Sequence, residues 1–483
     1  MLRPASVARL VCVLAFALSA LAVWAAPTHS ARPMLVGFQD DPGFRWSHDR
    51  STMIAAAARA HATVIRATAD WSQIAPTRPR LAIDAFDPAY QFTDLDDLTR
   101  TAAMNGMTVM LTIWGTPSWA NHGRGPNYAP DRMNDLYDFA HAVAERYSGR
   151  HPGYPFVGYY TVWNEPNSVR FLAPAYDAEG NPVSPGLYAV ICRFAYAGLK
   201  AGNPLATVAI GQTSSRGNLL GRPGAGSIAP GTFARLLAAQ RPAVPFDAWA
   251  HHPYSDLGYG PHQHYRFPNV NLSTLHTFEQ KLDQWFQRDD IPIWISEYGM
   301  ETRPARPGGV TVAQQAAYVR QALQIAADDP RVQMFIWFTL RDDPTYSTWD
   351  SGLIGDAGSR KPAFAVFADA AAGLDARNPV VEVPADTARP VLRLPLWELA
   401  IRDGVGCRIG SVISVYSGRR RIGTATPEAR IGVDGYASFQ LPIRRVRSGA
   451  RYRVVVGDIN DIHGNRVSRT AVVVGLPRVD RIG

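Results

Sequence analysis

The sequence predicts an α/β protein, a (β/α)8 barrel followed by a small all-β sandwich domain. Over residues 34–375, apolar runs alternate with amphipathic segments, and the alternation repeats eight times. Over residues 380–483 helical spacing is absent, and short β-rich runs are separated by Gly, Asp and Asn turns. No glycine-rich phosphate loop follows any run, which disfavours an open doubly wound sheet.

Eight apolar runs are the candidate barrel strands. Most are continuously apolar, which is typical of parallel strands that are buried on both faces. In chain order they occupy residues 34–38, 62–67, 107–114, 156–163, 206–211, 246–251, 291–296 and 332–338.

The segments between these runs have helical spacing and recognisable ends. Asp131 is the expected N-cap of one helix, which Gly149 terminates. Ser273 and Thr311 are expected to begin two later helices, and the last helix follows the eighth strand and ends at Gly373.

The N-terminus has the pattern of a secretory signal peptide at residues 1–25. Arg3 and Arg9 precede the apolar stretch LVCVLAFALSALAVWAA, and Ala25 ends a small-residue cleavage signal. A single membrane anchor is the alternative, although the stretch is short for a bilayer span. We therefore expect a secreted, extracellular protein with no stable membrane insertion after cleavage, and association with the cell envelope stays open.

Composition is that of an ordinary globular protein. The chain has 483 residues, 46% of them hydrophobic, and a formal net charge of +8. Arginines are scattered except at 418–421 and 444–447, where we expect solvated faces rather than a nucleic-acid site. Cys12 lies in the predicted signal, and Cys192 and Cys407 are either two buried thiols or one bridge.

Polar and aromatic residues gather where the predicted strands end. In an eight-stranded barrel these ends form the active-site face, so the residues are expected to lie together. They are Arg66, Trp114, Asn164, Glu165, His252, Tyr254, Glu297 and Trp337.

Glu165 and Glu297, after the fourth and seventh strands, form the pair that glycosidic bond cleavage requires. One protonated acid serves the leaving oxygen, and one carboxylate serves the anomeric carbon or its water. Taken singly, a Glu is usually a surface residue, a Trp usually core, and His252 a structural histidine. Together, at the ends of the correct strands, they predict a catalytic site.

The other residues of this set are expected to bind substrate or to support the pair. Asn164 can hydrogen-bond a sugar hydroxyl, and Tyr254 and Arg66 can donate to the Glu297 carboxylate. Trp114 and Trp337 offer flat apolar faces to a pyranose ring. The candidate substrate-binding residues are Asn164, Arg66, Trp114, His252, Tyr254 and Trp337.

No metal or organic cofactor is predicted. The stretch GPHQHYRF contains His262 and His264, but no carboxylate or cysteine stands at ligand spacing from them. We expect a polar loop there.

The motifs TVWNEPN and IWISEYG resemble those of the retaining glycoside hydrolases of clan A. TPSWA, HPY and GLIGD…KPAF are similar to glycoside hydrolase family 39, and secreted cellulase-like bacterial enzymes share some of these features. The resemblance covers residues 35–373. It implies double displacement on an oligo- or polysaccharide, with Glu297 as nucleophile and Glu165 as acid/base. Some relatives carry a histidine after the third strand, where this chain has Trp114 and, further on, His122.

Two other functions use the same residues. A non-catalytic carbohydrate-binding protein could occupy a hydrolase-like barrel, although the presence of both carboxylates argues against decay. A transglycosylase would use the same pair with a sugar as acceptor, and product analysis with added acceptor would distinguish it.

Overall fold

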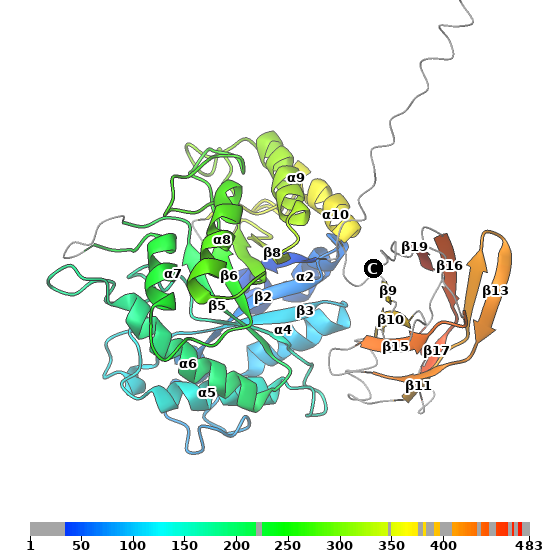
Figure 1. The fold of residues 1–483 in the computed structure, drawn as a ribbon, viewed down its shortest axis with the longest axis horizontal. Coiled ribbons are helices and arrows are strands. Elements are labelled where there is room, and N and C mark those ends of the chain that lie inside the picture. Colours follow the sequence, from blue (N-terminus) through cyan, green and yellow to red (C-terminus); the bar gives the residue numbers. More distant parts are fainter. Residues whose placement is uncertain are drawn as a thin grey trace, which may run out of the picture. The chain divides into compact units, whose positions relative to one another are not determined.

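The computed structural model describes residues 34–218, 225–345, 349–374, 380–382, 391–396, 408–431, 436–443, 451–461, 466–467 and 472–475. The predicted fold class is confirmed: eight parallel strands close into a barrel with helices between them, and antiparallel sheets form the C-terminal region (Figure 1). The predicted signal peptide and Cys407 lie outside the described residues.

The barrel strands pair in sequence order, and β1 closes the ring against β8. Gly37 of the first strand passes close to the second, because a Cβ added there would lie 1.7 Å from the carbonyl oxygen of Val64. The strands are β1 Leu35–Gln39, β2 Val64–Asp70, β3 Thr108–Trp114, β4 Tyr159–Val162, β5 Thr207–Ser214, β6 Ala248–His252, β7 Ile293–Tyr298 and β8 Val332–Phe338.

The barrel interior is packed with apolar side chains. Because side chains alternate along a strand, half of each strand faces this interior and half faces the helices. The buried interior cluster contains Val64, Met110, Ala209, Ala248, Ala250, Trp294, Met334 and Ile336.

Helices surround the barrel (Figure 1). They are α2 Arg50–Arg59, α3 Trp71–Ile74, α4 Thr93–Met104, α5 Met133–Arg146, α6 Ser184–Gly202, α7 Pro230–Ala238, α8 Leu275–Phe286, α9 Val312–Asp328 and α10 Pro362–Leu374. The described residues also form a π-helical segment, η1 Pro42–Trp46, and two 3-10 turns, η2 Ser118–Ala120 and η3 Leu272–Thr274.

One predicted helix start is confirmed and two are wrong. Thr311 caps α9, since its hydroxyl accepts from the backbone N–H of Gln314. Asp131 does not cap α5, because its carboxylate pairs with Arg124 and His122 in the preceding loop. Ser273 lies inside η3, and α8 begins only at Leu275.

The barrel's first strand and last helix meet at the end opposite the strand C-termini. The backbone N–H of Met34 donates to the carbonyl oxygen of Leu374 at 3.1 Å. The chain therefore enters and leaves the barrel at one point on that face.

The C-terminal region consists of three antiparallel sheets, with strand orders β15-β10-β9, β14-β11-β17-β18 and β13-β12-β16-β19. One buried cluster joins them, including Leu394, Ile409, Val415, Phe439 and Val454. The strands are β9 Val380–Glu382, β10 Val391–Pro395, β11 Arg408–Gly410, β12 Ile413–Ser417, β13 Arg420–Ala425, β14 Glu428–Arg430, β15 Tyr436–Gln440, β16 Arg451–Val456, β17 Ile459–Asp461, β18 Arg466–Val467 and β19 Val472–Gly475.

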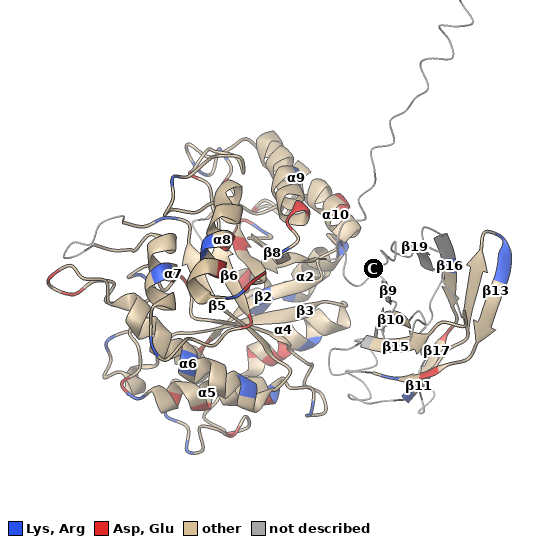
Figure 2. Cartoon of the chain, viewed as in Figure 1, with Lys and Arg blue, Asp and Glu red and all other residues tan. Residues whose placement is uncertain are grey.

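Charged residues of both signs are scattered over the helices of the barrel (Figure 2). The arginines at 419–421, at the start of β13, are exposed as expected, while the run at 444–447 lies outside the described residues. Within the described ranges, every helix is too short or too polar to traverse a bilayer.

Candidate active site

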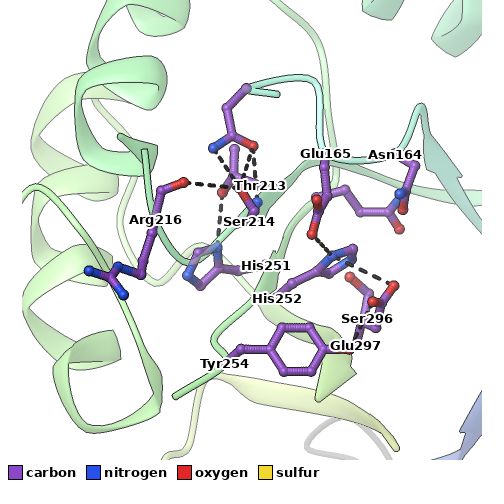
Figure 3. Close-up of polar contacts among 12 residues, drawn as sticks. Asn164, Glu165, Thr213, Ser214, Arg216, His251, His252, Tyr254, Ser296 and Glu297 are labelled. Carbon is purple, nitrogen blue, oxygen red and sulfur yellow. Dashed lines mark hydrogen bonds and ion pairs between the residues drawn. The ribbon is translucent and has the colours of Figure 1, made fainter. Parts of the chain in front are cut away.

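Glu165, His252 and Glu297 meet at the C-terminal end of the barrel, from the ends of β4, β6 and β7. His252 lies between the two carboxylates, as Figure 3 shows. Its Nδ1 is 3.0 Å from Glu165 Oε1 and 3.7 Å from Glu297 Oε2. This nitrogen and one oxygen of each carboxylate lie within 4.8 Å of one another.

Glu297 is held ionised by the donors around it. Arg66 Nη1 lies 2.7 Å from Oε2, and the Tyr254 hydroxyl donates to Oε1 at 2.8 Å. Burial alone would raise the pKa of Glu297. The charges of His252 and Arg66, with the hydrogen bonds from Tyr254 and Arg66, outweigh burial and hold that pKa below its ordinary value. A carboxylate that stays charged when buried is suited to act as a nucleophile.

Arg66 links the two halves of the site from inside the barrel. The sequence predicted that the second strand ends near Arg66, but β2 continues to Asp70, so Arg66 is a mid-strand residue with 1% exposure. Its Nη2 donates to Asn164 Oδ1 at 2.7 Å, and its Nη1 donates to Gln39 Oε1 at 2.5 Å. One guanidinium thus positions side chains after β4 and on β7.

Asn164 is oriented by this contact. Because its amide oxygen accepts from Arg66, its amide nitrogen is left to donate elsewhere. Asn164 also lines the cavity beside Glu297. The amide can therefore donate to a ligand hydroxyl next to the reacting carboxylates.

Glu165 stands on a backbone that leaves the regular strand geometry. Trp163 and Glu165 have positive φ angles of 66° and 34°, and so does Gln212 on β5, at 44°. Glu165 donates its backbone N–H to the Gln212 carbonyl at 3.0 Å, and the Gln212 side chain donates back to the Trp163 carbonyl. These bonds hold a strained turn that aims Glu165 at the mouth.

Two neighbouring histidines at the end of β6 face opposite ways. His252 turns to the carboxylates and has no exposed surface, and its Nε2 has no hydrogen-bond partner among the described residues. His251 is held behind the site by Thr213 Oγ1 and the Val270 carbonyl, at 2.9 and 3.1 Å. Burial, aided by the nearby His252, lowers the pKa of His251 to about 3.

A cavity of about 1010 Å³ opens beside Glu297. Of the predicted residues, Trp114, Asn164 and Glu297 line it. Trp337 does not; it has no exposed surface, and its indole N–H donates to the Ser351 carbonyl at 2.9 Å. The wall further includes Gln39, Asp41, Arg45, Trp46, Thr68, Asp70, Gln73, Ile74, Tyr90, Gln91, Thr93, Asp94, Phe171 and Phe338.

The charged part of this wall is an ion network. Arg45 bridges Asp41 and Asp94 at 2.7 Å each. Asp70, at the end of β2, adds a further carboxylate. Asp40, by contrast, accepts backbone N–H groups from Gly43 and Arg341 and shapes the loop after β1. Asp41 follows β1, Asp70 ends β2 and Asp94 lies in the first turn of α4, so no local motif joins them.

The trio of Glu165, His252 and Glu297 has the atom types of a metal site, but its surroundings disfavour a cation. Arg66 already places a positive charge on Glu297 Oε2 at 2.7 Å. A metal ion bonded to the same oxygen would face that guanidinium directly. The arrangement is better suited to moving protons than to holding a cation.

Comparisons with solved structures agree on the barrel fold. A glucosidase from Croceicoccus marinus has a TM-score of 0.53 and 14% identity, over 86% of this chain and 94% of that chain. GH5_18 from Streptomyces cattleya, in complex with GlcNAc, has a TM-score of 0.53 and 16% identity, over 72% and 82%. A family 39 glycoside hydrolase from Bacteroides cellulosilyticus has a TM-score of 0.48 and 16% identity, over 85% and 80%.

No curated protein matches the chain. The family model described as Cellulase (glycosyl hydrolase family 5) matches residues 28–339, which is more than half of the sequence. Family 5 is part of clan A, so the predicted resemblance to that clan is confirmed. The chain therefore belongs to the cellulase family, glycosyl hydrolase family 5, and is a retaining glycosidase.

Proposed function

We propose that this protein hydrolyses O-glycosidic bonds of an oligo- or polysaccharide outside the cell, with Glu297 as nucleophile and Glu165 as acid/base. The observation that carries this proposal is the close approach of the two carboxylates around His252. One oxygen of each lies within 4.8 Å of the other and of Nδ1. This spacing agrees with retaining enzymes, whose carboxyl groups are about 5–5.5 Å apart, and not with the roughly 6.5–9.5 Å of inverting enzymes.

The first step forms a glycosyl-enzyme. A Glu297 oxygen attacks the anomeric carbon, and the bond to the leaving oxygen breaks as Glu165 gives that oxygen its proton. Arg66 and Tyr254 keep Glu297 charged and aimed before the attack. The amide nitrogen of Asn164 donates to a sugar hydroxyl beside the reacting carbon.

The second step releases the sugar. Glu165, now ionised, takes a proton from a water molecule whose oxygen attacks the anomeric carbon, and the bond to Glu297 breaks. His252 Nδ1, 3.0 Å from Glu165 Oε1, contacts the carboxylate whose charge alternates during the cycle. A donor at this place stabilises the ionised form of Glu165 after the first step.

The cavity suggests a substrate longer than a single sugar. Its volume of about 1010 Å³ lies at the upper end of the range of about 300–1,000 Å³ for ligand pockets. Trp114 provides an apolar face, while Asp41, Asp70 and Asp94 provide acceptors for hydroxyl groups. The GlcNAc bound to GH5_18 and the glucosidase from C. marinus make glucose-type pyranosides the first substrates to test.

Export is proposed from the N-terminal sequence. The basic residues, the apolar stretch and the small residues before Ala26 together form a signal-peptide pattern. Sequencing the N-terminus of the protein recovered from culture medium would test this. Recovery only in the cytosol, with Met1 retained, would contradict it.

The two glutamate roles are tested by alanine variants on aryl glycosides. Glu297→Ala should be inactive on every substrate, because no glycosyl-enzyme can form. Glu165→Ala should still react with dinitrophenyl glycosides, whose leaving group needs no proton, and should accumulate the glycosyl-enzyme. General acid help contributes about 10²–10⁴ in rate, so its activity on poor leaving groups should fall by that factor.

Azide should rescue Glu165→Ala alone and give a glycosyl azide with the configuration of the substrate. Glu179→Ala, which removes an exposed carboxylate, is the matched control and should keep full activity. Equal residual activity of the Glu165 and Glu297 variants on dinitrophenyl glycosides, with no azide rescue, would overturn the assignment.

A further inference from the structure

A second cluster of metal-binding side chains lies between α8 and the end of α9, outside the site described above. His276 and Glu279 stand three residues apart on α8, and so share one face of the helix. Asp329 is the C-cap residue that directly follows α9. One ligand atom of each of the three lies within 4.8 Å of the others.

Glu279 is the unusual member of this cluster. Its side chain has no exposed surface, yet neither carboxylate oxygen has a hydrogen-bond donor among the described residues. The Nδ1 of His276 lies 3.5 Å from its Oε2. A buried carboxylate without a donor is costly, because it has lost water and gained nothing in return.

Arg331 is not the missing hydrogen-bond donor to Glu279. Arg331 lies close in sequence to Asp329, but its two terminal nitrogens contact the carboxylate of Asp283 at 2.8 and 2.6 Å. Its Nε and Nη2 also donate to the Ile291 carbonyl. The guanidinium is therefore committed to another partner.

Ligand access to the cluster is provided by a cavity of about 240 Å³. His276 and Asp329 line it, and so does His262 from the loop after β6. No sequence motif joins these residues, because no carboxylate stands at ligand spacing from His262 along the chain. Folding brings a further imidazole to the same opening.

We propose that His276, Glu279 and Asp329 bind a divalent cation of the Zn²⁺ type, which fastens α8 to the end of α9. One imidazole and two carboxylates are ligands that zinc accepts, with the remaining position open to water or to His262. The cation satisfies the Glu279 carboxylate, which faces the buried space without a donor, and it shares the Asp329 carboxylate, whose Oδ1 already accepts from the backbone N–H of Arg331 at 2.9 Å. Metal binding through Nδ1 leaves the proton on the other ring nitrogen of His276, so the Gln280 amide, whose nitrogen lies 3.1 Å from that atom, would present its oxygen there instead.

The test is zinc binding to the full-length protein, freed of any affinity tag and treated with EDTA. Calorimetric titration with ZnCl₂ should show a site that Glu279→Gln and His276→Ala each weaken at least tenfold. Glu279→Gln keeps the side-chain size, and His276→Ala changes an exposed residue, so the second variant decides if the first does not fold. His264→Ala, an exposed histidine of the same loop that does not line the cavity, is the matched control.

Thermal melts give a second readout that does not depend on catalysis. Zinc should raise the melting temperature of the wild type and of His264→Ala, and should do so much less in the two site variants. Equal zinc affinity in the wild type and in both variants would overturn the proposal, wherever else zinc is bound. Absence of saturable binding to the wild type, with Glu279 and Asp329 sharing a proton instead, would overturn it as well.

Discussion

The mouth of the barrel and the cluster between α8 and α9 contain the same kinds of side chain in different surroundings. Each brings one histidine and two carboxylates within 4.8 Å. At the mouth, Arg66 and Tyr254 donate to Glu297 and its pKa is lowered despite burial. At the second cluster Glu279 has no such donors, and burial, aided by the charge of Asp329, raises its pKa to about 8.

The difference teaches that burial alone does not decide the charge of a carboxylate. The Glu279 side chain has no exposed surface and the Glu297 side chain only 15%, but only Glu297 receives hydrogen bonds from a cation and a hydroxyl. Donors that are fixed in advance favour the ionised form, and their absence favours a proton or a metal ion. Residue types therefore do not identify chemistry until their partners are known.

Of the variants considered, Arg66→Ala should most strongly reduce the difference between the surroundings of Glu297 and those of Glu279. Arg66→Ala leaves Glu297 buried without its cation and frees Asn164, so kcat/KM should fall by about 10²–10⁴, the usual cost of losing one partner of a buried pair. The acid limb of the pH profile should move to higher pH, because only His252 and Tyr254 then oppose the effect of burial, which raises the pKa of Glu297. Arg66→Lys should have a kcat/KM between those of the wild type and Arg66→Ala. An acid limb that does not move in Arg66→Ala would contradict the role assigned to Arg66.

His251 tests the effect of burial on a base, because burial lowers the pKa of an imidazole whereas it raises the pKa of a carboxyl group. The pKa of His251 is lowered to about 3 in the folded protein, from an ordinary value of 6.5. The unfolded chain therefore takes up a proton near pH 6.5 that the folded chain refuses, and stability present above that pH is lost as the pH falls toward 3.

His251→Gln should accordingly lose less stability than the wild type between pH 7 and pH 4, by up to about 3 kcal/mol. Urea unfolding at the two pH values measures this difference. Parallel losses in wild type and variant would mean that His251 already takes up a proton in the folded state.

The tyrosine should have a smaller effect than the arginine. Tyr254→Phe removes one hydrogen bond to Glu297 but keeps the ring, and hydrogen bonds to charged groups contribute about 1.5–3 kcal/mol. We expect kcat/KM to fall by about 10–100-fold and the acid limb to shift upward by less than in Arg66→Ala. A larger shift than in the arginine variant would reverse the order of the two donors.

The smallest expected effect is the gain of zinc binding at the mouth of the barrel when Arg66 is removed. If Arg66 keeps cations away from the mouth, Arg66→Ala should bind one zinc ion more than the wild type does, at millimolar or lower zinc. Calorimetry on Arg66→Ala in a His276→Ala background isolates this event from the second cluster. Identical zinc binding with and without Arg66 would show that other features exclude the cation.

Much of the fold could be predicted, because buried parallel strands leave a strong apolar pattern. The eight runs all became strands, although their ends moved by up to several residues, as with β2. Glu165 and Glu297 could be brought together from sequence because strand C-termini share one end of such a barrel. Their catalytic roles stay a prediction.

The remainder depends on contacts between distant segments. Gln39 supports Arg66, and Asp94 completes the cavity wall through Arg45, yet neither stands in a motif. Asp131 has the residue type of a cap, but the loop folded back and gave it Arg124 instead. Glu279 stands in an amphipathic pattern that does not mark it, and only the packing of α8 against its neighbours buries it.

The backbone hydrogen bond between Met34 and Leu374 brings the two ends of the barrel domain together. Whatever is joined to the barrel at either end is attached at one point on the face away from the mouth. Both points of attachment therefore belong to the end of the barrel opposite Glu165 and Glu297, and neither takes a residue from the loops that surround the two carboxylates.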